Sequence, residues 1–222
     1  MKFALYILLT FAMAMTVIAQ AKPTTAADYE GTLQYAVRET NAAFPFIFTV
    51  VTKRYELGKL VSTQTDIAER QAQGIERETT LLKKGQKTLY SYSIQVGFDN
   101  QTYCSSDGKV WKGPQQYVCP GPTGSNLTML YGARDPMKIE YSVMEKDLNG
   151  KPVKVYRKYA VYLAQSDKDK YEYEEEIATI DDRGFFISVV NTEGTLAPKT
   201  ITLTRSQTWD FATKFKPVVA PK

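Results

Sequence analysis

The chain has 222 residues, a formal net charge of +4, two cysteines, fifteen tyrosines and no histidine. Without histidine it cannot form a His-based catalytic triad or an imidazole metal site, and two cysteines cannot build a cysteine-rich zinc or iron–sulfur centre. The nearly balanced charge gives no reason to expect a polyanionic partner, so we predict no nucleic-acid binding, no metal and no cofactor.

The N-terminal segment has the pattern of a secretory signal peptide. Lys2 precedes an apolar run, residues 3–19, which ends at the small-residue motif Ala19-Gln20-Ala21. The alternative is a transmembrane anchor, but the run is short for a bilayer span and lacks a positively charged flank after it. We therefore expect cleavage near Ala21 (signal peptide 1–21) and a single domain over residues 22–222. We place it in the periplasm or outside the cell, with no transmembrane anchor after cleavage.

The two cysteines are interpreted in that compartment. Cys104 and Cys119 form an even pair in an oxidising environment, for which a disulfide is the default expectation. Their spacing is not the C-x-x-C of a redox-active pair, so we predict a structural disulfide. Neither cysteine lies near the cleavage point, so no lipid anchor is expected. The sequons at Asn100 and Asn126 would mark surface positions only in a eukaryotic source.

A helix is predicted first in the mature chain, over residues 26–43. Tyr29, Leu33, Ala36 and Val37 recur there at the spacing of one helical face, and Pro45 ends the pattern.

From Phe46 onward the sequence predicts antiparallel strands. The clearest is Thr88–Phe98, in which aromatic and aliphatic residues alternate with polar or small ones. The same alternation recurs in Lys138–Glu145 and Lys170–Thr179. Less regular alternation predicts further strands at Phe46–Leu57, Lys59–Glu69, Gly74–Lys83, Pro152–Leu163, Gly184–Asn191 and Thr200–Ser206, with short ones around Tyr103 and Trp111. Short connections such as Asn149-Gly150 leave no room for crossover helices, so we predict a meander of about 11 antiparallel strands.

One segment interrupts this pattern, Pro120–Pro136. Ser125 or Asn126 could cap a short helix that ends at Gly132, and the flanking glycines and prolines suggest a lid.

The densest acidic cluster lies in the strand after residue 170. Glu172, Glu174 and Glu176 alternate with tyrosines, which predicts that they face solvent, whereas Glu175 shares the apolar side and would need a salt bridge. A carboxylate hydrolase requires only two acids facing a cleft, so it is kept as a third hypothesis.

The apolar positions of the strands suggest a cavity for a lipid or acyl chain, and the competing interpretation is an ordinary packed core. The predicted cavity-lining residues are Phe46, Phe48, Tyr90, Tyr92, Ile94, Val96, Phe98, Tyr141 and Val143.

Three stretches carry a family resemblance. They are Phe46-Ile47-Phe48-Thr49-Val50 with Arg54-Tyr55-Glu56 after the helix, the Tyr103 to Trp111 segment, and the run from Ile201 to Phe211 followed by Pro217 and Pro221. Together with the order of helix, meander and insert, they resemble the periplasmic lipoprotein-carrier superfamily of LolA/LolB-like carriers, mycobacterial LppX/LprG-type lipoproteins and RseB-like sensors. The resemblance implies a curved, mainly β half-barrel closed by helices, with a hydrophobic cavity for acyl chains.

We therefore expect a binding protein and not an enzyme. Its predicted ligand is a lipid or an acylated lipoprotein held in a half-barrel cavity, with a possible role in envelope lipid trafficking. The alternative is a protein-interaction or envelope-stress sensor module with a filled core and an envelope protein as its partner.

Overall fold

The computed structural model describes residues 21–96, 101–115, 135–164, 171–211, 214 and 216–221. Several predictions fall outside these residues and stay untested. They concern the signal peptide, the helical insert, Phe98, Asn100, Cys119 and Asn126.

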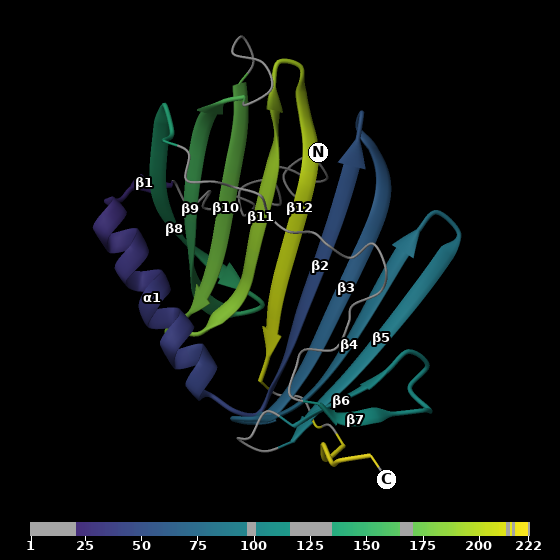
Figure 1. Ribbon diagram of the computed structural model, residues 1–222. Helices are drawn as coiled ribbons and strands as arrows, with labels where there is room; N and C mark the ends of the chain where they lie inside the picture. The colour runs from purple at the N-terminus through teal and green to yellow at the C-terminus, as the bar shows by residue number, and fades with distance from the viewer. Residues whose placement is uncertain are drawn as a thin grey trace, which may run out of the picture.

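The described chain forms one open sheet of twelve antiparallel strands and one helix (Figure 1). The strands are β1 (Lys22–Pro23), β2 (Phe46–Glu56), β3 (Lys59–Ala72), β4 (Ile75–Lys84), β5 (Lys87–Val96), β6 (Thr102–Ser105), β7 (Lys112–Gln115), β8 (Lys138–Leu148), β9 (Lys151–Leu163), β10 (Tyr171–Asp181), β11 (Phe186–Leu196) and β12 (Lys199–Asp210). The prediction of a mainly β, antiparallel fold with an N-terminal helix is confirmed, and an open sheet is consistent with a half-barrel.

The sheet has the spatial order β1-β8-β9-β10-β11-β12-β2-β3-β4-β5-β6-β7. It consists of two runs of sequence neighbours, β8 to β12 and β2 to β7, and the short strand β1 pairs with β8 at one edge. Pairing of the last strand, β12, with the first long strand, β2, joins the two runs, and Trp209 lies directly opposite Phe48 there. A simple meander would not contain this pairing, because its two strands are far apart in the sequence.

Helix α1 (Ala26–Ala42) crosses one side of β8 to β11, which we call the helix face (Figure 1). Thr25 caps it, because its side-chain oxygen accepts the backbone N–H of Asp28 at 3.1 Å. The buried helix positions include Tyr29 and Ala36, as predicted. Val37 is 49% exposed, contrary to the prediction. The next buried position is instead Thr40.

The apolar core lies between α1 and the sheet. Its buried members are Tyr29, Ala36, Tyr156, Ala178, Ile180, Phe186 and Val189. The ring of Trp209 packs on Phe186 at 5.1 Å and on Phe48 at 4.9 Å between centroids, so this core extends across the β12–β2 pairing. Thr40 accepts the backbone N–H of Phe186 at 3.0 Å, which fixes the end of the helix to the sheet.

We expect Phe186→Ala to lower the free energy of unfolding by about 3–5 kcal/mol, because it leaves a cavity between α1 and Trp209. Urea denaturation followed by circular dichroism measures the loss. Val37→Ala, on the exposed side of the same helix, is the matched control and should change the midpoint little. Equal midpoints for wild type and Phe186→Ala would contradict this account of the core.

Candidate functional site

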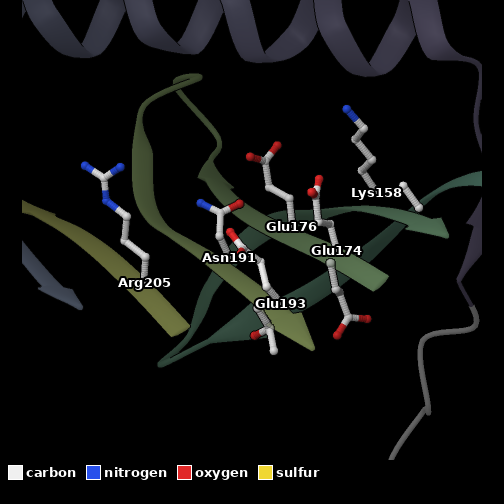
Figure 2. A pocket seen from close by; sticks show the side chains of 9 residues that line it. Lys158, Glu174, Glu176, Asn191, Glu193 and Arg205 are labelled. Atoms are coloured by element: carbon white, nitrogen blue, oxygen red, sulfur yellow. The ribbon is translucent and has the colours of Figure 1, made fainter. Parts of the chain in front are cut away.

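A cleft of about 300 Å³ lies on the helix face over β9 to β12. Figure 2 shows its lining side chains on the strands, with the ribbon of α1 across the cleft. The lining residues are Lys158, Ala160, Glu174, Glu175, Glu176, Asn191, Thr192, Glu193 and Arg205. The cleft is therefore rich in charge, whereas the neighbouring core is apolar.

The strand register brings these side chains into two rows. Paired residues of antiparallel strands share one face of a sheet, so a row follows from the cross-strand partners. In the first row Glu176 lies between Lys158 and Asn191, and Asn191 is in turn opposite Arg205. In the second row Glu174 lies directly opposite Glu193.

Two tyrosines hold the glutamates in place. The Tyr29 hydroxyl of α1 donates to Glu176 at 2.5 Å, and the Tyr162 hydroxyl donates to Glu174 at 3.1 Å. Burial of Tyr29, reinforced by this hydrogen bond and by the charge of Glu176, raises the pKa of its phenol far above the ordinary value. Tyr29 therefore stays a neutral donor that links the helix to the cleft.

The two basic residues of the cleft are available to a ligand. Within the described part of the chain, neither Lys158 nor Arg205 makes an ion pair or a side-chain hydrogen bond. Glu175, which shares the lining, is paired instead with Arg157 across the sheet at 2.6 Å. The cleft thus has unpaired cations at its sides and carboxylates between them (Figure 2).

The prediction that the acidic cluster faces solvent was wrong for Glu174 and Glu176. Glu174 and Glu176 are half-buried in the cleft, and β10 lies between β9 and β11 in the interior of the sheet. The expected salt bridge of Glu175 is confirmed by its contact with Arg157. The sequence alone does not reveal Asn191, Glu193 and Arg205 as site residues, because they join the cleft only through the register of three separate strands.

The opposed carboxylates also bear on the hydrolase hypothesis. Directly paired residues have Cβ atoms roughly 4.5–5.5 Å apart, so Glu174 and Glu193 are the candidate acid pair for this hypothesis. Like charges in opposite positions destabilise a sheet unless other groups compensate them, and Glu174 accepts a hydrogen bond from Tyr162.

The structure does not bring the predicted cavity residues together. Tyr141 and Val143 pack beside the core on the helix face, and the register places Phe46 and Phe48 on the same face. The strand pairings from β8 to β5 place the other four predicted residues on the opposite face of the sheet. These four are Tyr90, Tyr92, Ile94 and Val96. Residues on opposite faces of the sheet cannot line one cavity. Whether any of them binds a ligand stays a prediction.

The remaining predicted features can be located only in part. Cys104 is buried in β6, and since Cys119 lies outside the described residues the disulfide stays a prediction. Within the described ranges, no group of three acidic or cysteine side chains is placed to hold a metal ion. The same residues contain no helix that is long and apolar enough to cross a membrane.

Alkaline stability should depend on Tyr29. Its folded-state pKa is raised, so the stabilisation is present below about pH 10 and is lost as the pH rises and the unfolded chain releases the proton. We expect the free energy of unfolding to fall less between about pH 8 and about pH 11 in Tyr29→Phe than in wild type. Tyr35→Phe, at an exposed position of the same helix, is the control and should retain the wild-type profile. Identical profiles for Tyr29→Phe and wild type would contradict the prediction.

The sequence matches no protein-family model and no curated protein. Two solved structures share a distant likeness with it. LprF from Mycobacterium bovis is 12% identical, with 88% of this chain and 97% of that chain covered and a TM-score of 0.41. A DUF1329 family protein from Desulfovibrio piger is 6% identical, with 82% and 91% covered and a TM-score of 0.26. These values carry no conclusion on the function of this chain.

Proposed function

We propose that the protein is a non-catalytic carrier that holds a phosphate-bearing lipid between α1 and the sheet. The observation that supports this most directly is the charged cleft with two unpaired cations beside an apolar helix–sheet interface. The cleft suits a polar head group, and the apolar helix–sheet interface suits hydrocarbon.

The cleft would bind the head group. The guanidinium of Arg205 and the ammonium of Lys158 would contact the phosphate oxygens through charge-assisted hydrogen bonds. The carboxylates between them would accept hydrogen bonds from an ammonium or hydroxyl group of the same head group. Mixed charge of this kind favours a zwitterionic or hydroxylated head group over a free fatty acid.

The acyl chain would lie beside the core. A volume of about 300 Å³ is at the small end for ligand pockets, so the cleft alone would hold little more than the head group. Phe48, Tyr141 and Val143 are the predicted cavity residues that flank the helix–sheet interface, and we place the chain against them. Each buried CH₂ group would contribute about 0.8 kcal/mol to binding.

The proposed setting is the periplasm or the outside of the cell. It rests on the signal-peptide pattern of the first residues. A carrier of lipids or acylated lipoproteins in the envelope would be consistent with that setting.

A second candidate is an interaction or sensor module. The packing of Phe186, Trp209 and Phe48 favours it, because these rings already fill the space that an acyl chain would use. In this case the cleft would bind a polar group of a protein partner and no lipid would be retained.

Native mass spectrometry of the purified protein separates the two candidates. For the carrier we expect co-purified phospholipid and displacement of a fluorescent fatty acid by added phospholipid. The double variant Lys158→Gln, Arg205→Gln should retain at least tenfold less phospholipid, because it removes both phosphate contacts. Lys146→Gln, at an exposed position outside the cleft, is the control and should retain the wild-type amount.

Two results would contradict the carrier. A lipid-free mass with no displacement of the probe would favour the interaction module. Equal phospholipid retention by the double variant and wild type would show that the lipid lies elsewhere than in the cleft.

A further inference from the structure

One end of the sheet, which we call the upper rim, gathers the turns at residues 57–58, 85–86 and 197–198 (Figure 1). The opposite end, the lower rim, carries the turns at residues 73–74 and 149–150. Antiparallel pairing fixes this division, because successive hairpins alternate between the two ends. The two rims differ in both apolar exposure and charge.

Large apolar side chains are exposed at the upper rim. Leu57 is fully exposed, and Leu60 and Ile201 are 53% and 42% exposed. All three lie in or next to the hairpin ends of β2, β3 and β12. Single exposed apolar residues are common, but these three lie together at neighbouring strand ends, and such a group is a candidate for a contact outside the chain.

The backbone at Leu57 strengthens this point. Leu57 has φ 49 and Gly58 has φ 74, the left-handed pair that a two-residue hairpin turn requires. At the equivalent place in the β8–β9 hairpin the chain uses Asn149, with φ 56, which is a preferred residue there. A leucine at this position is unfavourable for the turn and buries nothing, so folding does not account for it.

The part of the upper rim that the β2–β3 and β4–β5 hairpins form is also strongly basic. Around the hairpins of β2–β3 and β4–β5 the exposed cations are Lys53, Arg54, Lys59, Lys83, Lys84 and Lys87. Glu56 is the one acid within these two hairpin ends, and it lies 3.4 Å from Arg54. No ion pair within the described residues involves any of the five lysines.

The lower rim has mixed charge. In the β8–β9 hairpin Lys146 and Lys151 alternate with Glu145 and Asp147. Further along the same rim, Arg183 pairs with Asp181 at 2.7 Å. The basic character therefore belongs to the upper ends of β2 to β5 and not to the surface in general.

We propose that the upper rim docks on an anionic lipid bilayer, with Leu57 inserted among the acyl chains and the lysines against the lipid head groups. Juxtaposed lysines and a protruding aliphatic residue match a negatively charged surface with an apolar interior. Docking requires no part of the cleft, so it goes beyond the proposed carrier function and can hold if that function fails.

Co-sedimentation with vesicles tests the proposal. We expect the full chain to bind vesicles of phosphatidylcholine mixed with phosphatidylglycerol, to bind pure phosphatidylcholine far less, and to dissociate as salt is raised. Failure of the wild-type protein to bind the anionic vesicles overturns the proposal. So does equal binding to both vesicle types.

Leu57→Asn separates docking from folding. We expect binding to the anionic vesicles to fall about tenfold, because insertion of the leucine is lost. The melting temperature should stay the same or rise, because asparagine suits the turn. Leu148→Asn, at an exposed leucine beside the lower-rim turn, is the matched control and should bind as wild type. Unchanged binding by Leu57→Asn overturns the insertion.

The charge is tested with two triple variants of equal net charge. Lys83→Gln, Lys84→Gln, Lys87→Gln should lower the affinity roughly fivefold for each lysine removed. Lys146→Gln, Lys151→Gln, Lys154→Gln changes the lower rim and should have little effect. Equal losses in both triples would show that net charge and not the upper rim governs binding, and would overturn the proposal. Phospholipid retention by native mass spectrometry should be unaffected by Leu57→Asn, which keeps the test independent of the carrier function.

Discussion

The pairing of β2 with β12 is the constraint on which the rest of the structure depends. It joins residues 46–56 to residues 199–210, so the sheet is complete only when the first long strand and the last strand meet. The packing of Trp209 between Phe48 and Phe186 makes the joint apolar and ties it to the core beneath α1. A shift of one residue would turn every side chain of β12 to the other face, which would remove Arg205 from the cleft. The same register also aligns the hairpin turns of the two runs, so that the turns of both runs lie at the same two ends of the sheet.

The sequence predicted the elements better than their relation to one another. Period-two alternation located the long strands and helical spacing located α1, because both signals lie within one segment. Alternation also shows that Tyr90 and Tyr92 share a face, and that Tyr141 and Val143 share a face. It does not show whether the two faces are the same, since that depends on the eight strand pairings from β8 to β5. The predicted cavity contained both pairs of residues, but the register places the two pairs on opposite faces of the sheet.

The cleft was missed because helix α1 covers the face of β10 on which Glu174 and Glu176 lie. Ala178 and Ile180 on that face are buried beneath the helix, whereas the alternation with tyrosines had suggested that this face points to solvent. Glu174 and Glu176 therefore occupy a cleft and not the surface. Their neighbours Asn191 and Arg205 have no sequence signal of their own, because each is polar within an otherwise ordinary strand. Only the assembled sheet makes them a site.

Leu57 and the carboxylates of the cleft lie toward the same end of the molecule, the upper rim. Glu174 and Glu193 lie a few residues from the ends of β10 and β11 at the upper rim. A lipid that left a bilayer at this rim would therefore reach the charged row before it reached the core. A leucine that is poor for its turn costs stability without helping the chain to fold. This leucine and the charged row lie toward the same end of the sheet, so a carrier that docked by the upper rim would take up its lipid at the end nearest the cleft.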